Sequence, residues 1–301
     1  MQTNMTNSTP RSTWRHPFSS VARPALLTLA VATLAGAITA PAQSSQSPVD
    51  FNHRVIKNKD LPKVRYTYLS TNTVLRVQNT FDPNGTNGVG GGPVSKVLCT
   101  IKANVNDPNA GKLTVNRRNY YLLEFHFHTP AEHTVDKYRT AMEVHFVFAD
   151  AAKVLGEPDS LLVVGAWIVP NSPATEDNPE LAKIFSNLPT TPTYVTVSNF
   201  NLRALLPSTG STFRYPGSLT SPAALPGYPN GVASQITEDV FPEIVSWVVS
   251  DETIGLSNKQ IEAYQALFPE GDARKTYPLG QRQVLHDKKP REHKGDNRGD
   301  E

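Results

Sequence analysis

The chain has 301 residues, 29 of them basic and 27 acidic, with a formal net charge of +2 at pH 7. That length is sufficient for one large domain with its own core. The balanced charge argues against a nucleic-acid-binding protein, which would carry an excess of basic residues. Cys99 is the only cysteine, so the chain has no internal disulfide. The strand-like run around Cys99 favours a buried thiol over a reactive one.

The first 42 residues have the composition of a targeting segment. They contain three arginines and no acidic residue, followed by an apolar run over 25–38 and by Ala40-Pro41-Ala42, a small-residue cleavage site. The apolar run is too short to predict a membrane span. We predict a signal peptide over 1–42 and an exported protein, periplasmic or secreted. An organelle transit peptide and an uncleaved N-terminal anchor are the alternatives. Removal of the three arginines would leave 26 basic against 27 acidic residues, a net charge of −1.

Beyond residue 42, short runs rich in β-branched and aromatic residues alternate with glycine and proline, a pattern typical of an all-β domain. Helical pattern is sparse and is best at 179–188 and 257–267, the second with Ser257 as a candidate N-cap. The strand-like runs are 66–68, 74–77, 97–101, 120–128, 142–148, 161–169 and 244–249.

Three further segments have distinctive compositions. Residues 82–93 are rich in glycine and asparagine and predict a flexible loop. Residues 222–241 are rich in proline and glycine. Residues 286–301 are highly charged, lack apolar side chains and predict a disordered tail. The main domain is therefore expected over 43–285.

The strongest functional signal is the pair of segments Glu124–His128 and Glu143–His145. Alternate residues of a strand share a face, so His126 and His128 would point one way and the intervening phenylalanines the other. If the two segments pair as neighbouring strands, three imidazoles converge, with one carboxylate two residues before the first and another two residues before the last. Three imidazoles with one open position are a ligand set of catalytic zinc. Ordinary exposed histidines are the alternative. The other histidines, most of which are expected to be solvent-exposed, are His16, His53, His133, His286 and His293.

These segments resemble the zinc-binding core of the α-class carbonic anhydrase family, over residues 124–147. Other landmarks of the family occur in the same order, so that the similarity spans roughly 46–284. The matching segments are Gln46–Asp50, Leu205–Pro207, Tyr215–Pro222, Val245–Trp247, Ile254–Gln260 and Gln281–Arg282.

The resemblance implies a mainly β single domain with a few short helices around a large central, twisted, mostly antiparallel sheet. It also implies one Zn²⁺ and the reversible hydration of carbon dioxide to bicarbonate and a proton by zinc-bound hydroxide. The substrate is then a small molecule, with no nucleic-acid partner and no stable membrane span after processing, and the oligomeric state stays open. A catalytically weak carbonic anhydrase-like binding protein is the alternative.

The same resemblance assigns roles to individual residues. His126, His128 and His145 are the expected zinc ligands, and Glu124 and Glu143 are the carboxylates behind them. Thr220 is the hydroxyl that orients the zinc-bound hydroxide, and Glu132 accepts the Thr220 proton. The expected substrate-binding residues are Val147, Val163, Leu219, Ser221, Val245 and Trp247.

The chain departs from the family pattern in several places. Glu124 stands where glutamine is usual, and an ionised carboxylate there would raise the pKa of the zinc-bound water. Fast members carry a proton-shuttling histidine, but no histidine lies between His53 and His126, and the corresponding segment is 77–81. An imidazole titrates near neutral pH, so its absence predicts slow turnover that imidazole buffer restores. The aromatic segment that usually precedes Gln46 is missing, and 222–241 looks like an insertion near the mouth of the site.

Overall fold

The computed structural model describes residues 45–52, 56–80, 100–105, 107–191, 193–221 and 240–287. All of them belong to the compact unit 41–301. The predicted targeting segment, the loop at 82–93, Cys99 and most of the 222–241 insertion lie outside these residues. Within them, no helix combines the length and apolar character that a membrane crossing requires.

Twelve of the described strands form one sheet, in the order β11-β4-β5-β7-β9-β10-β13-β12-β14-β2, with β6 pairing to β7 and β3 to β6. Most neighbours are antiparallel, whereas β10 with β13 and β14 with β2 are parallel. Strands β1 and β8 form a separate two-stranded sheet. The predicted fold class is therefore confirmed. The strands are β1 Asp50–Phe51, β2 Ile56–Asn58, β3 Val64–Leu69, β4 Thr73–Asn79, β5 Ile101–Val105, β6 Gly111–Val115, β7 Arg118–His128, β8 Thr134–Val135, β9 Met142–Asp150, β10 Leu161–Pro170, β11 Val195–Phe200, β12 Thr212–Gly217, β13 Val245–Leu256 and β14 Val284–Asp287.

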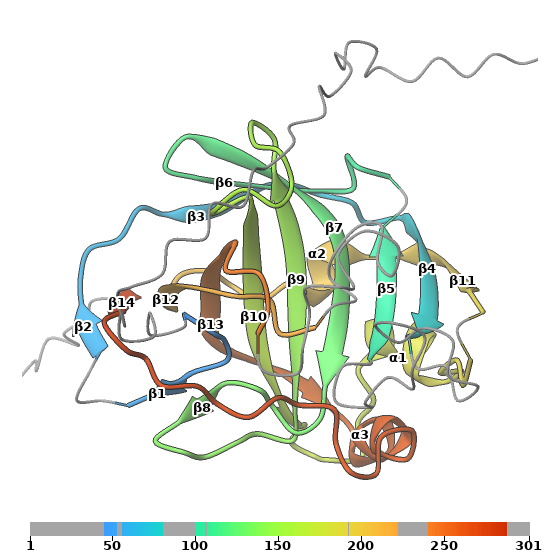
Figure 1. The fold of residues 1–301 in the computed structure, drawn as a ribbon. Helices are drawn as coiled ribbons and strands as arrows, with labels where there is room; N and C mark the ends of the chain where they lie inside the picture. Colours follow the sequence, from blue (N-terminus) through green and yellow to red (C-terminus); the bar gives the residue numbers. More distant parts are fainter. Residues whose placement is uncertain are drawn as a thin grey trace, which may run out of the picture. The chain divides into compact units, whose positions relative to one another are not determined.

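The central strands β7, β9, β10 and β13 lie side by side (Figure 1) and are buried along most of their length. Their alternate residues enter two different cores. Phe125 and Phe127 of β7 and Phe146 of β9 belong to the larger core. Val147 of β9 and Trp247 of β13 belong to a smaller core. Each buried phenylalanine contributes about 1.5–3 kcal/mol through removal of its surface from water. The predicted division of the two histidine segments into an apolar face and a polar face is thus confirmed.

The strand predictions succeed best where a run is long and apolar. β7, β9 and β10 contain their predicted runs, and β13 begins one residue after its predicted start at 244. Most of the run predicted at 97–101 lies outside the described residues, and the described strand β5 begins at Ile101. β6 and β12 were not predicted, since Gly111-Lys112-Leu113-Thr114-Val115 is weakly apolar and β12 contains Pro216. Pairing with neighbouring strands, which a local pattern does not reveal, determines these two elements.

The described helices are α1 Pro179–Phe185, α2 Leu202–Leu205 and α3 Asn258–Gln265. The prediction for α3 is confirmed, including its N-cap. The Ser257 hydroxyl accepts from the Gln260 N–H at 3.1 Å, and the Gln260 side chain accepts from the Ser257 N–H at 3.1 Å. This reciprocal pair is a capping box. α1 begins as predicted and ends three residues early, whereas α2 is a single turn that was not predicted.

The boundary predicted at 285/286 is wrong. His286 and Asp287 are buried members of β14, which pairs with both β12 and β2. The His286 ring stacks on Phe213 at 4.2 Å, and its Nε2 lies 2.7 Å from an oxygen of Asp251. The domain therefore extends at least to Asp287. The charged composition of the segment concealed this, because the partners that hold His286 lie on distant strands. Residues 288–301 are outside the described part of the chain.

Candidate metal centre and catalytic site

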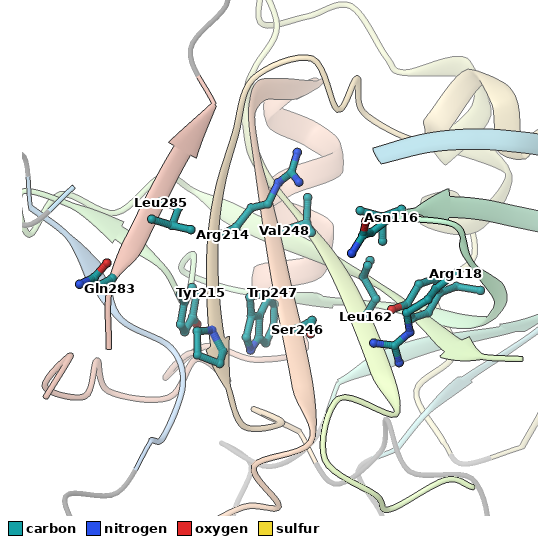
Figure 2. A pocket seen from close by; sticks show the side chains of 13 residues that line it. Asn116, Arg118, Leu162, Arg214, Tyr215, Ser246, Trp247, Val248, Gln283 and Leu285 are labelled. Carbon is teal, nitrogen blue, oxygen red and sulfur yellow. The ribbon is translucent and has the colours of Figure 1, made fainter. Parts of the chain in front are cut away.

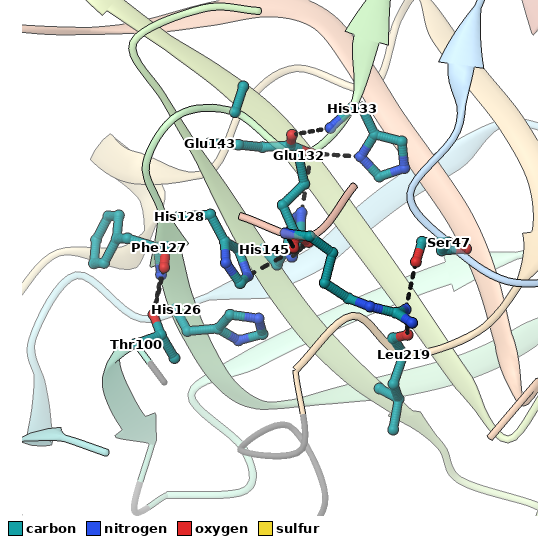
Figure 3. A network of polar contacts seen from close by, with 12 residues as sticks. Ser47, Thr100, His126, Phe127, His128, Glu132, His133, Glu143, His145 and Leu219 are labelled. Atoms are coloured by element: carbon teal, nitrogen blue, oxygen red, sulfur yellow. Dashed lines mark hydrogen bonds and ion pairs between the residues drawn. The ribbon is translucent and has the colours of Figure 1, made fainter. Parts of the chain in front are cut away.

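The register between β7 and β9 creates the histidine triad. His126 lies directly opposite His145, and His128 lies opposite Glu143. Ring centroids are 5.0 Å apart for His126 and His128, 5.2 Å for His126 and His145, and 4.8 Å for His128 and His145. Figure 3 shows the three rings directed toward one another. The predicted convergence of three imidazoles is therefore what the strand pairing produces.

One nitrogen of each ring faces a common point. His126 Nε2, His128 Nε2 and His145 Nδ1 are all buried and have no hydrogen-bond partner among the described residues. Ligand atoms of these three histidines lie within 4.8 Å of one another. A buried polar atom without a partner costs about 1–3 kcal/mol. Three such atoms converging on one point fit a metal ion, which would bond to all of them.

The opposite nitrogen of each ring is held by a different group. His126 Nδ1 lies 3.0 and 3.1 Å from the two oxygens of Glu124, and His145 Nε2 lies 2.9 Å from Glu143 Oε1. His128 Nδ1 is 3.4 Å from the backbone carbonyl of Asp272. Partners of this kind fix the ring orientation and the tautomer, and so direct the other nitrogen's lone pair toward the common point.

Burial keeps two of the rings neutral. It lowers the pKa of His126 well below the ordinary value, and electrostatic interactions with His128 and Lys102 add to this effect. Burial also lowers the pKa of His145, although Glu143 partly opposes the change. A metal binds neutral imidazole, so these rings need no deprotonation before they can act as ligands.

His133 is a residue whose role the sequence analysis missed. It belongs to a group of five histidines most of which were expected to be exposed, but it is completely buried. Its backbone N–H donates to Glu143 Oε2 at 2.7 Å, its Nδ1 lies 2.7 Å from Glu143 Oε1, and its Nε2 lies 2.6 Å from the Tyr215 hydroxyl. Tyr215 in turn donates to Ser47 Oγ at 3.0 Å. The sequence signal that could have revealed the role of His133 is its position inside the 124–147 segment that carried the resemblance.

His133, Glu143 and His145 form a second group of possible metal ligands. Their facing atoms are already hydrogen-bonded to each other at 2.7 and 2.9 Å. Burial alone would raise the pKa of Glu143, but the two histidines outweigh it and lower that pKa. This group is therefore a supporting chain behind His145 and not a second metal centre.

Glu132 and Thr220 meet at the same place. Glu132 is fully buried, and its Oε2 lies 3.6 Å from His128 Nε2 and 3.9 Å from His145 Nδ1. Burial alone would raise the pKa of Glu132, but the two histidines lower it overall. Hydrogen bonds from the Thr220 hydroxyl and from the Arg274 backbone act in the same direction. Glu132 is thus an ionised carboxylate beside the triad and not the surface ion pair that an isolated loop glutamate suggests.

The predicted apolar wall is also brought together. Val163 on β10 lies opposite Val147 on β9 and opposite Trp247 on β13. The Trp247 ring is 4.8 Å from the His145 ring. The buried cluster that contains these side chains also contains Leu219 and Val245, and the adjacent Ser221 is buried as well.

A separate cavity of about 300 Å³ is bordered by β10, β12, β13, β14 and the turn between β6 and β7 (Figure 2). Leu162 and Val248 line it, and both belong to the larger core. Arg118 and Arg214 contribute charged groups at its border. Of the predicted wall residues, only Trp247 also borders this cavity. It is therefore distinct from the space that the three histidines enclose.

Comparisons with known proteins agree with this geometry. The family model described as eukaryotic-type carbonic anhydrase matches residues 36–226. The chain is 27% identical over 189 residues to the carbonic anhydrase of Pectobacterium carotovorum, covering 62% of this chain and 66% of that protein. It therefore spans slightly less than two thirds of that bacterial relative. It is 24% identical over 269 residues to carbonic anhydrase 1 of Oryctolagus cuniculus, covering 82% of this chain and 94% of that protein.

Among solved structures, the chain is similar to the alpha-carbonic anhydrase of Thermovibrio ammonificans in complex with the inhibitor sulfanilamide. The TM-score is 0.59 at 27% identity, and the match covers 80% of this chain and 86% of that one.

Proposed function

Since this chain belongs to the eukaryotic-type carbonic anhydrase family, we propose that it catalyses the reversible hydration of carbon dioxide to bicarbonate and a proton. We propose that His126, His128 and His145 hold one zinc ion for this purpose. The observation that carries the proposal is the set of three buried, unpartnered nitrogens directed at one point.

Zinc supplies, when bound, a Lewis acid that lowers the pKa of a water molecule to about 7, an effect for which carbonic anhydrases are themselves the standard example. The protein's part is to leave the metal its full charge. Neutral imidazoles do this, and the depressed pKa values of His126 and His145 favour the neutral form. Glu124, Glu143 and the Asp272 carbonyl hold the rings in place.

Thr220 and Glu132 would orient the attacking group. We infer that the hydroxyl of Thr220, which helps to lower the pKa of Glu132, donates its one proton to that carboxylate, so that its remaining lone pairs can only accept. A group beside Thr220 must therefore donate to it, and its own lone pair is turned away from Thr220. Fixing the nucleophile in this way is catalysis by orientation.

The apolar wall suits the substrate. Carbon dioxide has no net charge and no hydrogen-bond donor, so a surface of valine, leucine and tryptophan side chains beside the metal can hold it. Val147, Val163, Leu219, Val245 and Trp247 belong to one buried cluster that reaches the His145 ring. We assign the substrate site to this cluster together with Ser221.

We also propose that residues 1–42 are a signal peptide and that the mature protein is exported. The acid-free, arginine-containing start, the apolar run and the small residues at 40–42 support this. N-terminal sequencing of the protein recovered from fractionated cells tests it. A mature chain that still begins at Met1 would contradict the proposal.

The test of catalysis combines metal analysis with stopped-flow hydration. We expect one zinc per chain, hydration of carbon dioxide, and inhibition by sulfanilamide. His128→Ala should lose both zinc and activity, whereas His286→Gln, which alters a buried histidine outside the site, should keep both. Zinc at one per chain without hydration would refute catalysis and favour the binding-protein alternative.

A further inference from the structure

We propose that Arg274 is a positioning residue that holds Glu132 and the Thr220 segment together and joins both to the start of the domain. This inference rests on the proposed function, because it concerns the pair of residues that would orient the nucleophile. It assigns a role to a side chain that lies outside the histidine motifs and the apolar wall. The three segments that it connects are remote from one another in the sequence.

The first connection is made by the backbone of Arg274. Its N–H donates to Glu132 Oε1 at 2.8 Å, across a sequence separation of 142 residues. Glu132 has two oxygens, and this bond engages Oε1, whereas the recorded approaches to the histidines are made by Oε2. The bond therefore fixes the rotation of the carboxylate and keeps Oε2 directed at the metal-facing nitrogens.

The second connection is made by the guanidinium of Arg274. Arg274 Nη1 donates to the carbonyl of Ser47 at 2.6 Å and to the carbonyl of Leu219 at 3.3 Å. Leu219 immediately precedes Thr220, so the second bond acts on the peptide unit that carries the catalytic hydroxyl. The Leu219 carbonyl also accepts from the Ser218 hydroxyl at 2.7 Å. Arg274 thus bridges the N-terminal segment and the Thr220 segment through one nitrogen.

The guanidinium is itself held firmly. The Arg274 side chain is almost fully buried, and its Nη2 donates to the Tyr277 hydroxyl at 2.8 Å and to Gln46 Oε1 at 3.4 Å. The charge lies over the rings of Phe241 at 4.3 Å and Tyr277 at 4.6 Å. Planar stacking combined with several directed donors is a task that arginine performs and lysine does not.

Ser47 extends the same connection to the other side of the triad. Its hydroxyl accepts from Tyr215, which contacts His133 behind Glu143 and His145. The hydroxyl of Ser47 also accepts from the Ser218 N–H at 3.1 Å. A Cβ at Gly217 would approach Ser47 Oγ to 2.2 Å, so glycine is required for this close passage. Arg274 therefore connects the groups that hold Glu132 and Thr220 to the groups that hold the expected metal ligand His145.

Arg282 offers a matched control. It is also an arginine that secures the N-terminal segment, because its guanidinium donates to the carbonyls of Ser45 at 2.9 Å and Gln46 at 2.8 Å. Its other recorded acceptors are the carbonyls of Pro216, Pro278 and Leu279. None of these bonds reaches Glu132 or Leu219. Loss of Arg282 should therefore loosen the N-terminal segment that Arg274 also binds, without affecting the positions of Glu132 and Thr220.

The experiment compares Arg274→Met and Arg282→Met, each alone and combined with Thr220→Ala, by zinc content, steady-state hydration and hydrogen exchange. We expect Arg274→Met to retain one zinc per chain and to lose about 10- to 100-fold in kcat/KM, the usual effect of removing a supporting partner. In the Thr220→Ala background the same change should cost less than about threefold, because the group it positions is gone. Arg282→Met should lower the unfolding temperature but change kcat/KM by less than about twofold.

Hydrogen exchange on the metal-free proteins gives a readout without activity. Amides of the segment 219–221 should exchange faster in Arg274→Met and at the unchanged rate in Arg282→Met, whose bond to the Pro216 carbonyl acts on the Gly217 amide instead. If Arg274→Met does not fold, Arg274→Lys supplies the same comparison, because it keeps the charge and loses the fork that reaches two carbonyls.

Three results would overturn the inference. They are equal losses of kcat/KM from Arg274→Met in the two backgrounds, equal losses from the two arginine variants, and unchanged exchange at 219–221. Wild-type protein that holds zinc without hydrating carbon dioxide would refute the proposed function instead. In that case the exchange comparison would still decide whether Arg274 holds the segment.

Discussion

Glu124 and Glu143 occupy the same place in their two motifs, two residues before a histidine, and the structure moves their pKa values in opposite directions. Burial raises the pKa of Glu124 from 4.5 to about 7, and the nearby charge of Lys102 reduces the rise. Burial acts on Glu143 in the same way, but His133 and His145 outweigh it and lower the pKa. The difference arises because Glu143 contacts two histidines at 2.7 and 2.9 Å, whereas His126 is the only described histidine within hydrogen-bonding distance of Glu124.

This difference has a measurable effect on the metal-free protein. The change in pKa of Glu124 from 4.5 to about 7 corresponds to about 3 kcal/mol, since one pKa unit is about 1.4 kcal/mol. The folded state binds this proton more tightly than the unfolded state, so the stability contributed by protonated Glu124 is present below pH 4.5 and lost as the pH rises to about 7. Glu124→Gln has no such proton to lose and has nearly the same shape. Relative to wild type, it should gain about 3 kcal/mol between pH 4.5 and pH 8.

Urea denaturation of metal-free Glu124→Gln and wild type gives the difference in their free energies of unfolding at each of the two pH values. Effects of the substitution on packing are the same at both pH values, so they cancel when the two differences are compared. Glu143→Gln is the control with the opposite sign. Because folding lowers the pKa of Glu143, its ionised carboxylate stabilises the protein at pH values above the pKa of the unfolded state, and this stability is lost on acidification. The stability of Glu143→Gln relative to wild type should therefore fall as the pH rises. A Glu124→Gln difference that stays constant within about 0.5 kcal/mol would refute the reasoning. Zinc should reduce the gain at high pH, because a nearby cation favours the ionised carboxylate.

Three other predictions concern turnover, substrate access and stability. Because no histidine lies between His53 and His126, maximal hydration should increase with imidazole concentration, and a fast rate that is independent of buffer would contradict this. Val163→Phe should lower kcat/KM at least tenfold with zinc retained, because Val163 faces Trp247 in the apolar cluster. Hydration kinetics with metal analysis test this prediction, and an unchanged kcat/KM would remove Val163 from the substrate site. Ser257→Ala should cost about 1 kcal/mol by removing the cap of α3, with no change in zinc content, as thermal unfolding would show; an unchanged midpoint would mean that the capping box adds nothing.

The histidine motifs were predictable because a strand encodes its faces with a period of two. Phe125 and Phe127 identify the core side of β7, and that places His126 and His128 on the other side without further information. Pairing with β9 required only a second segment of the same kind. Glu132 was different, because its own neighbourhood suggests an exposed ion pair and only the family resemblance indicated its role.

The supports of the site could not be predicted in the same way. Asp272 acts on His128 through a backbone carbonyl, and Arg274 acts on Glu132 through a backbone N–H. Every residue has a backbone carbonyl and every residue except proline has a backbone N–H, so no side-chain pattern identifies them. His133 was misjudged because its partners, Glu143 and Tyr215, come from different strands. His286 was misjudged for the same reason, since β14 is held by β12 and β2.

The separations along the chain have a consequence for folding. Arg274 joins Ser47 across 227 residues, and the Asp272 carbonyl supports His128 across 144. Contacts between residues this far apart in the sequence form late in folding, because the long loop between them must first be ordered. A nascent chain that ends before residue 272 already contains every metal ligand but lacks the groups that support His128 and Glu132. The supported centre is therefore completed only when the two ends of the domain meet.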